Sequence, residues 1–198
     1  TRDGLQLGAA LNVITVDLEN TSVRELNRTL HALPADTNER LWRVVNPRGA
    51  HAVAAGLTLP IEVTIEGHVG YYCAGMNQAA CLTIHGHAGP GLAENIMSGV
   101  VRVTGNASQA AGASGHGGLV VIEGDASARC GISMKGVDIV VRGAVGHMSA
   151  FMAQAGRLVA AYVPWQSWDT HVAMGHANPA TTGPLQRDRD ALAMEFPP

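Results

Sequence analysis

Five glycines stand nineteen residues apart in the middle of the chain, and this period constrains the fold more than any other feature. Each glycine ends a short run with aliphatic residues two and four positions before it, as in Val63-Thr-Ile-Glu66. This alternation is typical of a β-strand with one buried face. The sequence therefore predicts five equivalent strands, which end at Gly67, Gly86, Gly105, Gly124 and Gly143.

Small residues recur at two further places in every repeat. Three residues after the glycine stand Gly70, Gly89, Ser108, Ser127 and Gly146, and seven residues after it stand Ala74, Ala93, Gly112, Gly131 and Ala150. A strand followed by sharp turns with small residues at fixed places is typical of one coil of a solenoid, where the neighbouring coil leaves no room for a side chain. We predict an all-β solenoid, a parallel β-helix of 19-residue coils, over residues 60–162.

Before this column, the N-terminal segment of residues 1–59 contains a helix signal. Ser22-Val-Arg-Glu25 is a capping box, and leucines on one helical face follow it until Pro34. We expect a short helix over residues 23–32 that covers the side or end of the column, because an uncovered terminal coil exposes a strand edge. Val44-Val-Asn46 indicates a degenerate first coil.

After the column, the repeat code breaks. Tyr162 stands where the period predicts a sixth glycine, although Leu158 and Val159 still fit a strand. Residues 163–198 carry prolines and two tryptophans without strand alternation or a helical stripe. We expect them to form an irregular tail.

Charge and hydropathy exclude several classes of partner. The chain has 13 lysines and arginines against 16 aspartates and glutamates, a net charge of −3, and thus no basic surface for nucleic acid. No apolar run approaches the ~20 residues of a membrane span, and the start lacks the pattern of a signal peptide. We expect a cytoplasmic protein with neither nucleic acid nor membrane as partner.

Two pairs of sulfur-containing residues share repeat positions. Cys73 and Cys130 stand three coils apart, about 14 Å at the strand spacing of a sheet, which is beyond disulfide reach. We expect both to be buried thiols. Met76 and Met152 also share a position, and we expect them to fill the core.

Three histidines form the best candidate for a metal site. His68 and His87 follow the glycine in neighbouring coils, and His85 lies nearby. The alternative is an exposed ladder of turn residues, continued by Asn106 and Asp125, and we favour it because a structural zinc ion needs four ligands. The sequence shows no Ser–His–Asp triad, no Cys–His pair and no two acids stacked in adjacent coils. We predict no catalytic, cofactor-binding or metal-binding residue in this chain.

Four strings within the repeats resemble the GXGXG-repeat family, which includes the C-terminal right-handed β-helix domain of the glutamate synthase large subunit. The strings are Tyr71–Asn77, Gly89–Gly99, Ser127–Gly136 and Gly146–Met152. The resemblance covers roughly residues 21–160 and implies a right-handed helix. Among the members of this family, the chain is most similar to the separately encoded type that serves as the B subunit of methylamine–glutamate N-methyltransferase.

This resemblance implies a non-catalytic scaffold in a heteromeric enzyme. One partner would resemble a class II glutamine amidotransferase, and another would resemble the synthase domain that binds FMN and an iron–sulfur cluster. The complex would convert methylamine and glutamate to N-methylglutamate and ammonia, with no cofactor held by this chain.

The residues that would contact these partners are polar members of the recognised strings and two tryptophans of the tail. Glu94, Asn95, Arg129, Lys135 and His147 are candidates for a surface that faces a partner or borders a channel for ammonia or methylamine. The alternative is that they are solvated turn residues. Trp165 and Trp168 are either interface anchors or fold back on the column of their own chain.

Two other functions remain open at the level of the sequence. One stays within the repeat family, namely the C subunit of a formylmethanofuran dehydrogenase or of the related formyltransferase–hydrolase complex. The other is a hexapeptide-type acyltransferase, which requires a six-residue sub-period. Nineteen is not a multiple of six, so the acyltransferase is disfavoured.

Overall fold

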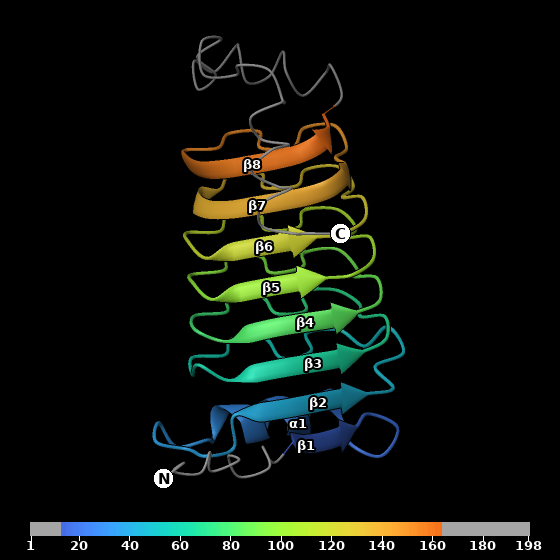
Figure 1. Cartoon of the computed structure of the whole chain (residues 1–198), viewed down its shortest axis with the longest axis vertical. Helices are drawn as coiled ribbons and strands as arrows, with labels where there is room; N and C mark the ends of the chain where they lie inside the picture. The colour runs from blue at the N-terminus through green and yellow to red at the C-terminus, as the bar shows by residue number, and fades with distance from the viewer. Residues whose placement is uncertain (1–12, 164–198) are drawn as a thin grey trace, which may run out of the picture.

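The computed structural model describes residues 13–163, and these form one column of stacked strands (Figure 1). Eight parallel strands make a single sheet in sequence order, which confirms the predicted all-β solenoid. The strands are β1 (Val13–Asp17), β2 (Leu41–Val45), β3 (Glu62–Glu66), β4 (Cys81–His85), β5 (Val100–Val103), β6 (Leu119–Ile122), β7 (Lys135–Ala144) and β8 (Ala155–Tyr162). In the described part of the chain, no helix is long and apolar enough to span a membrane.

From β3 onward, the strands pair with the predicted nineteen-residue offset. One row of paired residues runs through Val63, Leu82, Val101, Val120, Ile139 and Leu158. The first five members of this row are at most 1% exposed, so the alternation buries one face of each strand as the sequence predicts. The nineteen-residue offset also holds in the middle of β7 and β8, from the Asp138–Arg157 pair to the Val141–Ala160 pair. The register then shifts by one residue, so that Tyr162 pairs with Ala144.

The first two coils depart from the period. Val13 pairs with Leu41, and Leu41 pairs with Glu62, twenty-one residues later. The sequence does not predict β1, because no glycine marks its end and the helix lies between it and β2. The degenerate first coil is the coil that begins at β2.

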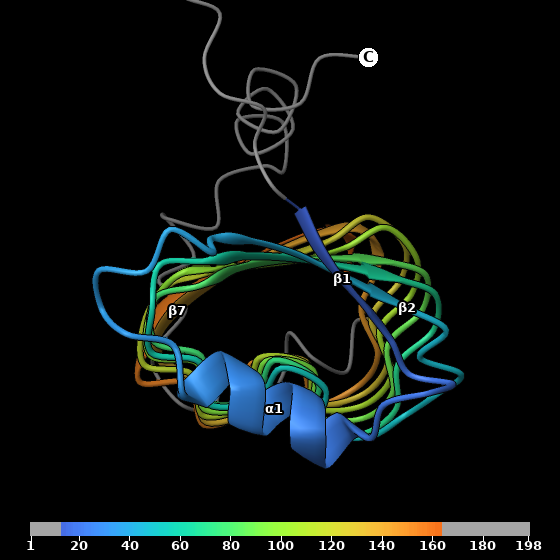
Figure 2. The same cartoon turned by 90° about the horizontal axis from the view of Figure 1, so that it is seen from below.

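The helix α1 (Val23–His31) covers the end of the column next to β1, as Figure 2 shows from below. Its capping box is formed, because the Ser22 hydroxyl accepts from the Glu25 backbone N–H at 3.2 Å and the Glu25 carboxylate accepts from the Ser22 N–H at 3.1 Å. Leu26 and Leu30 are buried against the column. The expected helix is confirmed to within one residue at its end.

Side chains of α1 also replace the hydrogen bonds of a missing coil. Asn27 accepts from the Ala54 N–H at 2.9 Å and donates to the Ala52 carbonyl at 2.8 Å. His31 Nε2 lies 2.8 Å from the Ala55 carbonyl oxygen. The lower end of the column is therefore closed by polar contacts as well as by leucines.

The glycines that end the strands are required for space. A Cβ atom at Gly86 would lie 2.6 Å from the carbonyl carbon of Gly67, and one at Gly105 would lie 2.5 Å from the carbonyl oxygen of Gly86. Among the five glycines only Gly67 has a positive φ, of 130°. The preceding coil, rather than the backbone conformation, excludes a side chain at the later four positions.

The turns opposite the sheet have an alternating backbone. In each of the five regular coils, the residues five, seven and nine positions after the glycine have positive φ, as at Tyr72, Ala74 and Met76. The N–H groups of successive members point to opposite coils: Tyr72 donates to Pro90 and Ala74 donates to Val53. The middle member is buried as well as left-handed, which explains why it is always alanine or glycine.

One prediction about the core is wrong. Met76 and Met152 are 55% and 52% exposed, so they do not fill the interior. Their position, nine residues after the glycine, faces outward in every coil. Asn95, Ser114 and Ser133 occupy it in the three intervening coils and are partly exposed.

Candidate interaction surface

The two histidines that follow the glycine belong to a ladder that joins successive coils. His68 Nδ1 accepts from the His87 backbone N–H at 2.9 Å, and His87 Nδ1 accepts from the Asn106 N–H at 2.8 Å. The next two coils repeat the contact. Asn106 Oδ1 accepts from the Asp125 N–H at 3.0 Å, and Asp125 Oδ1 accepts from the Ala144 N–H at 2.8 Å. The predicted turn ladder is confirmed.

The same geometry argues against a metal ion between these rings. The imidazoles of His68 and His87 are stacked, with centroids 4.9 Å apart and planes within 15°. Because each Nδ1 accepts a hydrogen bond, the neutral ring carries its proton on Nε2. Parallel rings also point their nitrogens in one direction, whereas ligands converge on zinc at ~2.0–2.1 Å. Residues 13–163 contain no group of three or more His, Cys, Asp or Glu side chains that could hold a metal.

Cys73 and Cys130 are buried thiols, as predicted. Cys73 and Cys130 are both free and fully buried, whereas Cys81 is exposed at the start of β4. Burial raises the pKa of the Cys73 and Cys130 thiols to about 12. A thiol with such a pKa stays protonated at neutral pH and is a poor nucleophile and metal ligand.

The predicted partner-contact residues lie on three different coils. Glu94 and Asn95 are partly exposed in the turn between β4 and β5, and Asn95 has a φ of 55°. Arg129 and His147 are exposed on adjacent coils, and the Arg129 N–H donates to the His147 carbonyl at 2.9 Å. Lys135 is exposed at the start of β7.

The structure therefore brings the backbones of Arg129 and His147 together and places Glu94 on an earlier coil. Trp165 and Trp168 lie outside the described residues.

The turns opposite the sheet carry an exposed aromatic cluster that the repeat pattern of the sequence does not lead us to expect. Tyr71, Tyr72 and Met76 are 48%, 53% and 55% exposed, and the two tyrosine rings have centroids 6.2 Å apart. The rings of His51 and Tyr71 form a T-shaped pair with centroids 4.8 Å apart, and His51 Nδ1 accepts from the Tyr71 N–H at 2.9 Å. We call these residues, together with Glu94, the tyrosine patch.

A signal for this patch is present in the sequence. Two adjacent tyrosines are conspicuous in a chain with only 4% aromatic residues. Their turn positions carry mostly small or polar residues in the other coils. Aromatic side chains that serve packing would stand at the alternating strand positions instead.

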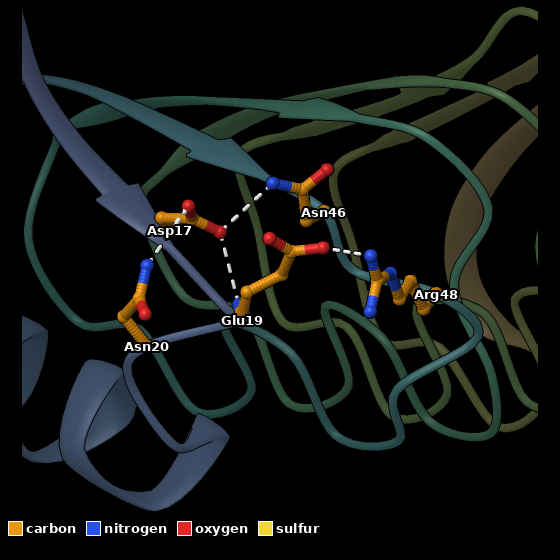
Figure 3. A network of polar contacts seen from close by, with 5 residues as sticks. All are labelled: Asp17, Glu19, Asn20, Asn46 and Arg48. Atoms are coloured by element: carbon orange, nitrogen blue, oxygen red, sulfur yellow. Dashed lines mark hydrogen bonds and ion pairs between the residues drawn. The ribbon is translucent and has the colours of Figure 1, made fainter.

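A second polar cluster, shown in Figure 3, fixes the lower end of the sheet. Asp17 at the end of β1 accepts from the Glu19 N–H and from Asn46 Nδ2, both at 2.9 Å, and from Asn20 Nδ2 at 3.2 Å. Arg48 forms an ion pair with Glu19. These contacts tie β1 to the turn after β2, so they have a structural role.

Comparison with known proteins gives one significant similarity. Over 62 residues the chain is 59% identical to "Protein GlxC" of Rhizobium meliloti (strain 1021), a match that covers 31% of this chain and 27% of that protein. The chain therefore matches about a quarter of the length of this curated relative. No family model and no solved structure matches the chain.

Proposed function

We propose that this chain is a non-catalytic subunit of a glutamate synthase-related enzyme complex. The observation that carries this proposal is that the imidazole and thiol groups of the regular coils have structural roles. The Nδ1 atoms of His68 and His87 cap backbone N–H groups, and Cys73 and Cys130 are buried thiols. The identity with GlxC and the GXGXG strings support the family.

More specifically, we propose that the complex makes N-methylglutamate and ammonia from methylamine and glutamate. Its other subunits would be an amidotransferase-like chain and an FMN-binding, synthase-like chain. The donor set of this column does not fit an iron–sulfur cluster, because Cys73 and Cys130 are buried three coils apart and Cys81 stands alone at the surface. The cluster and the flavin would therefore belong to the synthase-like partner.

The column would act by position. Parallel strands joined coil by coil, with turns that also bond between coils, make a stiff body. Such a body can hold two partner sites in fixed register, and reaction or transfer between fixed sites avoids the entropic cost of bringing the reactants together. The proposed contacts between the column and its partners remain Glu94, Asn95, Arg129, Lys135 and His147.

The test is co-expression with the two partner subunits, followed by purification through a tag on this chain. We expect both subunits and flavin absorbance to co-purify and the complex to form N-methylglutamate from methylamine and glutamate. Failure of both subunits to bind would refute the proposal. Recovery of formylmethanofuran dehydrogenase-type subunits from the native source would favour that alternative function.

Two variants separate a scaffold from a catalytic subunit. Gly105→Ala places a Cβ against the Gly86 carbonyl oxygen and should lower the yield of complex, whereas His85→Ala removes an exposed side chain and should not. The complex that does form with Gly105→Ala should keep the amine preference of the wild type. A normal yield with altered amine selectivity would contradict the scaffold role.

A further inference from the structure

We propose that the tyrosine patch is a docking surface on which a partner subunit places an arginine side chain, with Glu94 as its counter-charge. The patch comprises His51, Tyr71, Tyr72, Met76 and Glu94. This inference rests on the proposed function in one respect, because it assumes that the chain works within a complex. It adds the surface and the chemistry of the partner.

The backbone at Tyr72 and Met76 is strained for bulky residues. Their φ values are 58° and 56°, in the left-handed region that large side chains rarely adopt. The equivalents of Tyr72 in the four later coils also have positive φ, and they are Gly91, Ala110, Arg129 and Met148. Because glycine and alanine suffice at this position, the fold does not require a tyrosine there. The left-handed conformation belongs to every regular coil, so the feature that the fold leaves unexplained is the tyrosine and not the strain.

The exposed surface of the patch does not stabilise the fold. Tyr71, Tyr72 and Met76 each keep about half of their surface in solvent, although they stand within six consecutive residues. Tyrosine and methionine are enriched in protein interfaces, where a few aromatic side chains supply most of the binding energy. The patch therefore has the composition of an interface and not of a core.

The Tyr72 ring and the Glu94 carboxylate lie beside the same glycine, Gly91. A Cβ atom on Gly91 would lie 2.5 Å from Tyr72 Cδ1 and 2.9 Å from Glu94 Oε2, so both side chains border the same bare α-carbon. Within residues 13–163, Glu94 is in no ion pair. A ring face and a free carboxylate both attract a cation.

Arginine fits this arrangement better than lysine. Its planar guanidinium can stack on a tyrosine ring and still donate hydrogen bonds to a carboxylate. The Tyr71 ring, 6.2 Å from that of Tyr72 and fixed by His51, extends the aromatic surface. The apolar Met76 side chain would cover the aliphatic part of the incoming residue.

The test measures binding of the purified full-length chain to the immobilised partner subunits, together with its thermal midpoint. Tyr72→Gly installs the residue found at Gly91, so it relieves strain and should leave the midpoint equal or higher. It should weaken binding on the order of tenfold or more. Glu94→Gln should weaken binding less and reduce its dependence on salt.

Ala110→Gly is the matched control, because it makes the same backbone change at the same repeat position two coils away. It should leave binding unchanged. If the wild-type chain binds the partners and Tyr72→Gly binds them within twofold as tightly, the docking surface is refuted and the proposed function stands. If the wild-type chain binds neither partner, the proposed function fails and this inference fails with it.

Discussion

His68 Nδ1 accepts a hydrogen bond from the backbone N–H of His87, its counterpart one coil later, at 2.9 Å. The next three steps of this ladder use an imidazole, an amide and a carboxylate for the same purpose. A side chain with an acceptor atom at the δ position can therefore accept the hydrogen bond from the next coil. The ladder thus depends on hydrogen-bond geometry and not on histidine chemistry.

This equivalence predicts different effects for two substitutions of His87. His87→Ala leaves the Asn106 N–H without its acceptor and should lower the free energy of unfolding by about 0.5–1.5 kcal/mol. His87→Asn should retain most of the stability, because Asn106 makes the same contact one coil later. Urea denaturation of the two variants measures the difference. Equal losses would show that the acceptor contributes nothing.

The column itself could be predicted from the sequence because its physical cause repeats. Each coil lies so close to the one before it that no side chain fits at the strand end, so glycine returns every nineteen residues. The strand alternation beside the glycine indicates the buried face. In β1, the apolar Ile14 and Val16 flank the polar Thr15, but no glycine ends the strand. Its Val13–Asp17 segment is separated from β2 by the helix, so no period connects the two strands.

The repeat pattern does not predict the tyrosine patch, because the composition at its position in the coil is not uniform. The adjacent tyrosines stand out only by their rarity in the chain. Five residues after the glycine stand a tyrosine, a glycine, an alanine, an arginine and a methionine, yet all five have positive φ. The conformation comes from hydrogen bonds between coils, such as that from Tyr72 to Pro90 at 2.9 Å, and not from local propensity. Sequence patterns report such positions only where burial also restricts size.

The left-handed turns predict an unusual stabilisation by glycine. Ala110 has a φ of 61°, a conformation that costs an alanine about 1–2 kcal/mol in the folded state. Glycine avoids this cost, but its greater freedom stabilises the unfolded chain by about 0.4–1 kcal/mol. Ala110→Gly should therefore raise the free energy of unfolding by about 0.5–1 kcal/mol. Ala79, whose φ is not positive, is the control, and Ala79→Gly should lower stability. A loss of stability in Ala110→Gly, measured by urea denaturation, would contradict this account of the turns.

The three cysteines should differ sharply in reactivity. Cys81 is exposed, while burial shields Cys73 and Cys130 and raises the pKa of their thiols to about 12. Iodoacetamide at neutral pH should label Cys81 alone in the native protein and all three cysteines in denaturant. Mass spectrometry of the digested protein identifies the labelled sites. Rapid native labelling of Cys130 would show that the column opens between its coils.

The pairing of Asp138 with Arg157 predicts a loss of stability in acid. Arg157 lies against the Asp138 carboxylate, with Nη2 2.6 Å from Oδ2, and its hydrogen bond holds the pKa of Asp138 below the ordinary value of 3.8. A carboxyl group with a lowered pKa in the folded state stabilises the protein fully above that ordinary value. The contribution disappears as the pH falls through the lower, folded-state pKa.

Asp138→Asn should accordingly be less stable than the wild type at neutral pH by about 0.2–1 kcal/mol, since the pair is partly exposed. The difference in free energy of unfolding should shrink toward zero as the pH falls below 3.8. Arg157→Gln removes the other partner and should show the same pH dependence. Urea denaturation at a series of pH values measures both variants, and a difference that stays constant into acid would show that the charge on Asp138 does not stabilise the last coil.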